Sequence, residues 1–381
     1  MPNSVFVIGG NHHNTLGVIR SLGERGIKPY VVIQQDDMPQ YVSRSKYISK
    51  CWLVTDEKEV IDVLLGDAIE YHHGMKAVLI ACADNLSSLV DMHSSELESM
   101  YYIPGAKEQG RISYLMDKEV MSGLARETGF TVPQSIAVNT TDNEKISIPL
   151  PWIIKPLLSK DGHKSDIERV YTSDEWRNYC GRHSIKVQVQ QLIDKDFEYQ
   201  LIGLSLDSGH EVIIPGVSQV IRPAATTNTG FLHYSPLDDS YQGVLELSRR
   251  FLIATGYSGL FSLELLRGKD GTDYFMEINF RNDGNAICVT AAGMNLPYIW
   301  YLYNTGGDYL KEISQSSIKD VYVMPEFADV EFVRNKELGL SAWLKDIRRT
   351  DRFMEFDGKD RRPFFFMLRG RLRNYLKKHL F

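Results

Sequence analysis

The stretch Tyr274-Phe-Met-Glu-Ile-Asn-Phe-Arg281 alternates apolar and polar side chains. In a β-strand, this alternation places Glu277, Asn279 and Arg281 on one face. Carboxylate and amide oxygens are suited to Mg²⁺, and an arginine offers a planar fork to phosphate or carboxylate oxygens. The face therefore predicts contacts to a metal ion and an anion, although a solvent-facing hairpin edge would show the same alternation.

A second strand is predicted just upstream, over Leu260–Leu266, and the turn-rich segment 267–273 joins the two. Antiparallel pairing would bring Glu264 beside Glu277 and Asn279. The polar continuation over residues 281–285 favours a functional site, because such a cluster is unusual directly after an apolar strand.

Composition and charge exclude several classes of protein. The chain has 381 residues, 43% of them hydrophobic, which is enough for two or three domains with apolar cores. A formal net charge of -6 gives no overall field that favours nucleic acid. Four scattered cysteines and ten histidines lack the spacing of a disulfide framework or a zinc site. No leader or membrane-spanning pattern is evident, so we expect a cytoplasmic location.

The first third of the sequence predicts a parallel sheet. Apolar runs at residues 5–8, 29–33 and 77–82 alternate with helix-like segments, as in strands joined by crossover helices. Ligands of such sheets gather beyond the carboxyl ends of the strands, which here means residues 9–14, Asp36 and Asp84.

A nicotinamide-binding domain is the obvious competitor, with Asp36 or Asp37 as the acid that binds the ribose. After Gly9-Gly10, however, the chain continues with Asn11-His-His-Asn14, so the G-x-G-x-x-G fingerprint is missing. The histidine doublet is compatible with a substrate mouth and equally with a loop that has no chemical role.

Two lysines are candidates for binding phosphate. Lys118 lies in a helix predicted from Tyr114 to before Gly129, and Lys155 lies in the apolar strand 151–156. An ammonium group within an apolar strand favours an anionic partner, although a solvated edge lysine is the plain alternative. The loop 158–165 that follows is rich in lysine and hydroxyl groups. This composition suits a loop that closes over bound phosphates, but an ordinary surface loop would have the same composition.

Three further features complete the set. A predicted strand over residues 185–193 could offer its backbone to an adenine. Glu198, at the start of the next strand, could reach sugar hydroxyls or a cation. Arg222 ends a strand over residues 212–223 and could contact a phosphate or an acceptor substrate. Each is also compatible with an ordinary strand end or turn.

Taken in order, these features resemble the ATP-grasp superfamily over roughly residues 1–300. The resemblance assigns nucleotide binding to Lys118, Lys155, Ser159, Gly162, Gln190, Gln191, Leu192, Ile193 and Glu198, and metal binding to Glu264, Glu277 and Asn279. Arg281, Arg222 and Lys155 would act on the transferred phosphate and acyl group. The chain departs from many relatives in having Gln190 and Gln191 where an acidic residue is common, and in having only Gly162 in the covering loop.

The resemblance implies an α/β (α+β) protein, with a Rossmann-like domain at 1–110, a small lid subdomain at 111–190, a large subdomain at 191–325 and a C-terminal extension at 326–381. ATP, with Mg²⁺ or Mn²⁺, would lie between two antiparallel sheets. Within the superfamily the chain looks most like the amino-acid ligase and carbamoyl-phosphate-synthase-like branch. The implied reaction converts a small carboxylate to an acyl phosphate that an amine then attacks. A homodimer is expected.

Two other functions remain open. A carbamoyl-phosphate-type phosphotransferase would use bicarbonate or carbamate, and a catalytically silent protein would only bind ATP. Outside the resemblance, the segment 359–381 interleaves basic and bulky apolar residues. Leu368, Leu372, Leu376 and Leu380 recur at every fourth position, which we interpret as an apolar face opposite Arg369, Arg373 and Lys377. This pattern is compatible with a membrane-surface helix, but we favour a helix packed on the body or on a second subunit.

Overall fold

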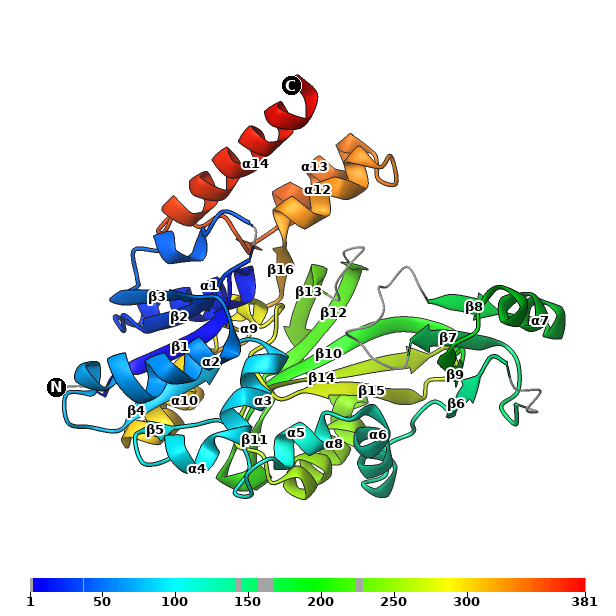
Figure 1. Ribbon diagram of the computed structural model, residues 1–381, viewed down its shortest axis with the longest axis horizontal. Helices are drawn as coiled ribbons and strands as arrows, with labels where there is room; N and C mark the ends of the chain where they lie inside the picture. Colours follow the sequence, from blue (N-terminus) through cyan, green and yellow to red (C-terminus); the bar gives the residue numbers. More distant parts are fainter. Residues whose placement is uncertain (1–2, 37, 142–145, 157–166, 224–228, 381) are drawn as a thin grey trace.

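The computed structural model describes residues 3–36, 38–141, 146–156, 167–223 and 229–380. Three β-sheets lie within these residues, and helices cover them (Figure 1). The parallel sheet of the N-terminal part is followed by two antiparallel sheets, so the expected fold class is confirmed.

The parallel sheet has the strand order β3-β2-β1-β4-β5. Its elements are β1 (Val5–Gly10), α1 (His13–Glu24), β2 (Tyr30–Gln34), β3 (Lys50–Val54), α2 (Glu57–Asp62), β4 (Ala77–Ala81), α3 (Asp84–Met92), α4 (Ser94–Leu97) and β5 (Tyr101–Tyr102). The central strands are continuous apolar runs because helices bury them on both faces, as expected for parallel strands.

The small antiparallel sheet has the order β6-β9-β7-β8. It contains β6 (Ser135–Asn139), β7 (Trp152–Pro156), β8 (Glu168–Val170), α7 (Ser173–Arg182) and β9 (Lys186–Gln191). Two helices precede it, α5 (Arg111–Leu115) and α6 (Lys118–Glu127), so the single helix predicted from Tyr114 is wrong. The break arises because the Asp117 side chain accepts hydrogen bonds from two backbone amides and starts a new helix.

The large sheet has eight strands, mostly antiparallel, among the described residues. They are β10 (Lys195–Leu206), β11 (Glu211–Ile213), β12 (Gly216–Pro223), β13 (Gly230–Pro236), β14 (Gly259–Gly268), β15 (Asp273–Asn279), β16 (Val321–Met324) and β17 (Arg352–Phe353). The predicted hairpin is confirmed, with Glu264 opposite Glu277 and Ser262 opposite Asn279. The single strand predicted over 212–223 is instead divided at Pro215, which cannot donate to a sheet ladder.

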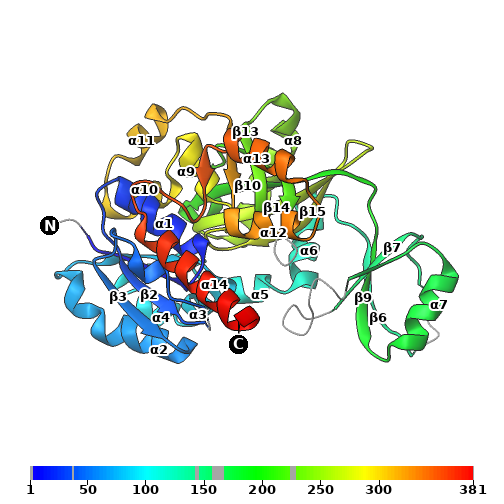
Figure 2. The same cartoon turned by 90° about the horizontal axis from the view of Figure 1, so that it is seen from above.

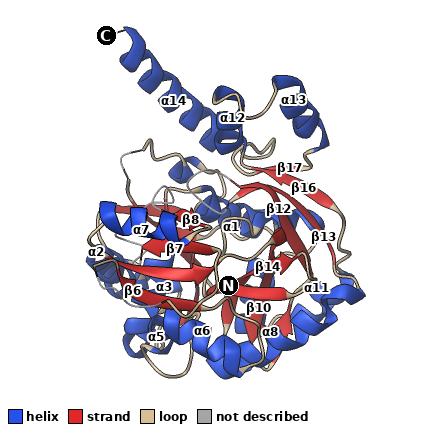
Figure 3. Ribbon diagram, turned by 90° about the vertical axis from the view of Figure 1, so that its right-hand side faces the viewer, coloured by secondary structure: helices blue, strands red, loops and turns tan. Residues whose placement is uncertain are grey.

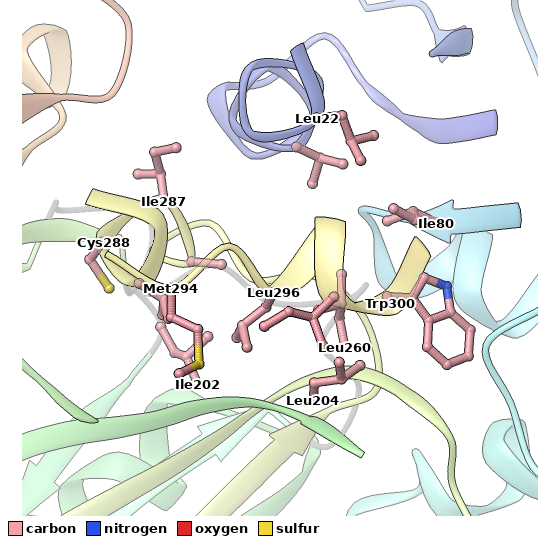
Figure 4. Packing of buried hydrophobic residues seen from close by; sticks show 14 of the residues in the cluster. Leu22, Ile80, Ile202, Leu204, Leu260, Ile287, Cys288, Met294, Leu296 and Trp300 are labelled. Atoms are coloured by element: carbon pink, nitrogen blue, oxygen red, sulfur yellow. The ribbon is translucent and has the colours of Figure 1, made fainter. Parts of the chain in front are cut away.

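A shared core joins the parallel sheet to the large sheet. The helices between and around them are α8 (Gln242–Thr255), α9 (Ile287–Ala292), α10 (Leu296–Thr305) and α11 (Tyr309–Gln315). Figure 4 shows Leu296 and Trp300 of α10 between Ile80 of the parallel sheet and Leu204 of the large sheet. This continuous packing fixes the carboxyl edge of the parallel sheet next to strands β14 and β15.

The C-terminal extension forms α12 (Glu326–Arg334), α13 (Leu340–Arg349) and α14 (Arg362–Leu380). Its strand β17 pairs with β16, so the large sheet takes a strand from beyond residue 325. Figures 2 and 3 show α14 starting on the N-terminal domain and running outward to the C-terminus. In the part of the chain that the structure describes, no helix combines the length and apolarity needed to cross a membrane.

Candidate active site

A cavity of about 720 Å³ lies between the small and the large antiparallel sheets. Strands β7, β9, β10, β14 and β15 all contribute to its wall. Eight of the candidate residues named from the sequence line it, namely Lys118, Lys155, Gln190, Gln191, Leu192, Ile193, Glu198 and Glu264. Residues as far apart in the sequence as Lys118 and Glu264 are thus gathered around one space large enough for a nucleotide.

The two candidate lysines reach the cavity from different elements. Lys118 is the first residue of α6, and Lys155 lies on β7. The Lys155 Nζ donates a 2.7 Å hydrogen bond to Oε1 of Gln190 on the neighbouring strand. Burial, reinforced by the charge of Lys118, lowers the pKa of Lys155. An anion placed between the two ammonium groups would relieve this repulsion.

The segment expected to bind adenine follows β9. The backbone amide of Gln191 donates to the Gln134 carbonyl, and that of Leu192 donates to the Pro151 carbonyl at 2.9 Å. The fold therefore already uses these two donors. Glu198, near the start of β10, forms a 2.6 Å ion pair with Lys195 at the cavity rim. Recognition of base and ribose by these residues stays a prediction.

The predicted metal ligands form a hydrogen-bonded group on β14 and β15. The Asn279 Nδ2 and the Gln200 Nε2 each donate to Oε1 of Glu264 at 3.3 Å. Glu277 lies directly across from Glu264. Its pKa is raised by burial, an effect that the nearby Lys118 partly offsets. The donor set of two carboxylates and one amide fits a hard cation such as Mg²⁺, which favours oxygen ligands and leaves other positions to phosphates or water.

Metal binding would require a change in this group. The Asn279 Oδ1 accepts a 3.0 Å hydrogen bond from Arg281, while the amide nitrogen faces Glu264. The oxygen would have to turn toward the cation. Among the described residues, no cluster of three or more His, Cys, Asp or Glu side chains is arranged for a metal ion, so the amide is needed to complete the proposed ligand set.

Arg281 links the metal-ligand group to the parallel sheet. Its guanidinium binds both carboxylate oxygens of Asp84, at 3.0 and 3.1 Å, and Asp283 at 3.0 Å. Asp84 begins α3, directly beyond β4, at the carboxyl edge where ligands of a parallel sheet were expected. The side chain of Asp84 is 57% exposed, so an incoming anion could replace it on the arginine.

Arg222 does not line the cavity among the described residues. It forms 2.8 Å hydrogen bonds to both carboxylate oxygens of Asp329 and a 3.0 Å bond to Asp346. These partners come from α12 and α13, in the segment expected to be an extension. In this structure the guanidinium therefore ties the C-terminal extension to β12, and its role toward a substrate stays a prediction.

The sequence offers three further places whose side chains could select the acceptor, namely residues 11–14, residues 226–229 and His233. Asn11 contacts Asp36 and the backbone of residues 39–42, and Asn14 donates to the carbonyls of Cys82 and Asn282. His233 on β13 pairs with Asp320, which directly precedes β16. Ser159, Gly162 and residues 226–228 lie outside the described residues.

Sequence reasoning missed Gln200 and Asn285. Gln200 lines the cavity, binds Glu264, and accepts a 2.8 Å hydrogen bond from the Asn285 Nδ2. Gln200 follows Glu198 by two residues on β10, so the period-2 pattern would have placed it on the same face. Asn285 ends the polar cluster that was singled out after β15, but its partner could not be read from the sequence.

Comparison with known proteins gives matches by structure. No family model matches the sequence, and no curated protein matches it. An L-amino acid ligase from Bacillus licheniformis has a TM-score of 0.59 at 17% identity, over 80% of this chain and 74% of the other. An N5-carboxyaminoimidazole synthetase from Staphylococcus aureus has a TM-score of 0.62 at 14% identity, over 88% and 86%. A biotin carboxylase from Campylobacter jejuni, solved as an ATP complex, has a TM-score of 0.60 at 15% identity, over 80% and 71%.

These proteins are ATP-grasp enzymes, and the matches cover most of the chain. The chain therefore has the ATP-grasp fold, as its residues indicated. At identities of 14 to 17%, the likeness establishes the fold and leaves substrate and reaction to be argued from the site.

Proposed function

We propose that this chain of ATP-grasp fold is a cytoplasmic ligase, dependent on ATP and Mg²⁺, that joins a small carboxylate such as an amino acid to an amine. One observation carries the proposal. Lys118, Lys155 and Glu264 line a single cavity, and hydrogen bonds continue from Glu264 through Asn279 to Arg281 at the edge of the parallel sheet. These hydrogen bonds would connect the phosphate-binding region near the two lysines with a second anion-binding position at Arg281.

The nucleotide would lie in the cavity with its phosphates near Lys118 and Lys155. The partly buried Lys155 is costly to keep charged without an anion, and the nearby charge of Lys118 adds to that cost. A triphosphate supplies the missing negative charge. The base would lie at the segment 190–193, and Glu198 would bind the ribose. The biotin carboxylase that resembles the chain was solved as an ATP complex, which supports a nucleotide here.

Glu264, Glu277 and Asn279 would hold Mg²⁺, or Mn²⁺ in its place. When bound, the cation would neutralise phosphate charge during phosphoryl transfer. Glu264, Glu277 and Asn279 would hold it through oxygen atoms on two paired strands, and strand pairing fixes the separation of these residues better than a loop would.

The reaction would occur in two steps. An oxygen of the substrate carboxylate attacks the γ-phosphorus of ATP, and the bond to the β-phosphate oxygen breaks to release ADP. The amine nitrogen then attacks the carbon of the acyl phosphate, inorganic phosphate leaves, and the nitrogen loses a proton. Lys155 and Arg281 would stabilise the charge that moves onto the transferred group. Arg281 would exchange Asp84 for substrate oxygens, and no covalent enzyme nucleophile is needed.

The test is phosphate release from Mg·ATP by the purified protein, screened against pools of amino acids, other small carboxylates, amines and bicarbonate. We expect ADP and phosphate only when a carboxylate and an amine are both present, with a condensed product in the mass spectrum. Turnover with bicarbonate alone would replace the proposal with a carbamoyl-phosphate-type phosphotransferase. ATP binding without turnover in any pool would identify a silent binder.

A further inference from the structure

Helix α14 is attached to the N-terminal domain along one side. Met367 is only 4% exposed and packs in a cluster with Leu16, Ile19 and Val42. A Cβ atom on Gly370 would lie 2.4 Å from the Pro39 side chain, so the helix lies directly on that proline. These contacts hold the helix in one rotational position about its axis.

The opposite side of α14 carries a stripe of large apolar side chains. Phe365, Leu368, Leu372 and Leu376 are between 41% and 56% exposed. Spacings of three and four residues place all four on one face of a helix. We call these four residues the apolar stripe. Because Met367 and Gly370 fix the other side, the stripe cannot turn toward the body of its own chain.

The charges around the stripe are all positive. Residues 361–381 contain seven Lys and Arg and no Asp or Glu, whereas the whole chain has a net charge of -6. Arg369 and Arg373 are exposed and directly follow Leu368 and Leu372. At about 100° per residue, they border the stripe rather than oppose it as the sequence interpretation had it.

The position of the helix leaves room for a flat surface. Figures 1 and 3 show α14 extending from one end of the molecule, with α12 and α13 at the same end. Helix α13 also carries large exposed apolar side chains, Leu340 at 58% and Leu344 at 41%. Several exposed apolar residues in one region mark an interaction surface more strongly than scattered ones.

We propose that the apolar stripe and its bordering arginines bind the surface of an anionic lipid bilayer. The apolar side chains would enter the boundary between headgroups and acyl chains, and the arginines would contact lipid phosphates. The positive charge of α14 favours lipid binding over pairing of this helix with its copy in a second chain. A two-fold contact through the stripe would bring the arginines of both copies together, with no acidic residue on either helix to offset them.

This proposal does not depend on the ligase function. It also modifies the preference drawn from the sequence, which was a helix packed on the body or on a second subunit. The first half of α14 packs on the N-terminal domain through Met367 and Gly370. The apolar stripe lies on the opposite side of the helix and stays exposed.

The experiment is co-sedimentation of the full chain with vesicles. We expect binding to vesicles of phosphatidylglycerol mixed with phosphatidylcholine at low salt, release at high salt, and no binding to phosphatidylcholine alone. Failure to bind the anionic vesicles at low salt would overturn the proposal, as would equal binding to both lipid compositions.

Two variants locate the contact. The pair Leu368→Ser and Leu372→Ser should weaken binding about tenfold or more, because two inserted side chains are lost. The pair Arg369→Gln and Arg373→Gln should weaken it to a similar extent and flatten its salt dependence.

The matched control is Ile253→Ser with Leu310→Ser, two comparably exposed residues on α8 and α11. It should bind like the unmodified chain, and an equal loss in the control would count against the stripe. Sedimentation equilibrium of the same proteins tests the alternative, in which a second copy of the chain covers the apolar stripe. A dimer that the leucine variant dissociates, combined with no vesicle binding, would assign the stripe to a second copy.

Discussion

Two regions of this molecule remove charged side chains from water, and they satisfy these charges in opposite ways. In the cavity between the antiparallel sheets, Lys155 has one hydrogen bond to a described residue, a 2.7 Å bond to an uncharged amide oxygen. At the junction of α1 with the C-terminal extension, Arg20 is 1% exposed and binds Asp360 together with three backbone carbonyls. Asp360 in turn accepts from Ser45 and from the Lys46 amide.

The comparison indicates that the charge of Arg20 stabilises the fold, whereas the charge of Lys155 is a candidate for binding a ligand. The junction satisfies Arg20 and its partner within the fold, so nothing further can bind there without breaking bonds. The cavity leaves positive charge next to about 720 Å³ of space. A buried ion pair is costly to break, whereas a buried cation beside a cavity can gain stability from a ligand. Substitutions at Arg20, Glu277, Lys155 and His13 test this difference.

Arg20→Ala should destabilise the fold by about 3–5 kcal/mol, because it leaves Asp360 buried without its cation. Denaturant unfolding followed by tryptophan fluorescence measures the change. The matched control is Arg25→Ala on the same helix region, where a half-exposed arginine pairs with Glu312. It should cost less than about 1 kcal/mol. Similar values for both variants would remove the distinction.

Glu277→Gln should lower ATP turnover by about 10²–10³-fold, because one oxygen ligand of the proposed metal site is replaced by a neutral amide. Stability should change little, since burial already disfavours the charged form of this residue. Adenine nucleotide affinity, measured by calorimetry without metal, should be largely retained. The control is Glu246→Gln on the exposed face of α8. Normal turnover by Glu277→Gln would exclude it from the mechanism.

Lys155→Met should weaken ATP binding about tenfold to a hundredfold, equal to about 1.4–2.7 kcal/mol, because a buried cation that faces the phosphates is lost. The thermal stability of the ATP-free protein should stay the same or rise, since a desolvated charge is removed. Lys186→Met on β9 is the control, because that lysine is exposed. Unchanged nucleotide affinity in Lys155→Met would return this residue to a purely structural role.

The junction should also respond to pH through His13. Burial lowers the pKa of His13, and the neighbouring His12 lowers it further. The Nδ1 atom of His13 lies 3.6 Å from Oε1 of Glu355. Burial raises the pKa of Glu355, and the nearby Glu326 raises it further. The folded chain therefore binds fewer protons at His13 than the unfolded chain does. Stability should fall as pH drops below about 6.5, by up to about 1.4 kcal/mol per pH unit from this group.

Unfolding of His13→Gln at a series of pH values measures that contribution. The variant should lose less stability than the unmodified chain between pH 7 and 5, about 1 kcal/mol less per unit. The exposed His210, replaced in the same way, is the control. Parallel pH profiles for His13→Gln and the unmodified chain would show that His13 is not kept neutral by the fold.

Local sequence patterns predicted the elements that carry the site. Alternation over 274–281 and the turn before it predicted the hairpin and the pairing of Glu264 with Glu277, which the structure confirms. Apolar runs predicted the parallel sheet. Gln200 was missed although it follows Glu198 by two residues on β10, because an uncharged side chain in a strand gives no signal of its own.

Other features were decided only by the tertiary structure. Arg281 meets Asp84 across 197 residues, and Arg222 meets Asp329 across 107. Local periodicity fixes which face a side chain occupies on its own element, but it carries no information on which distant element packs there. For the same reason, the sequence indicated that α14 is amphipathic, while only the packing of its Gly370 on Pro39 and of its Met367 against the N-terminal domain determined which side stays exposed.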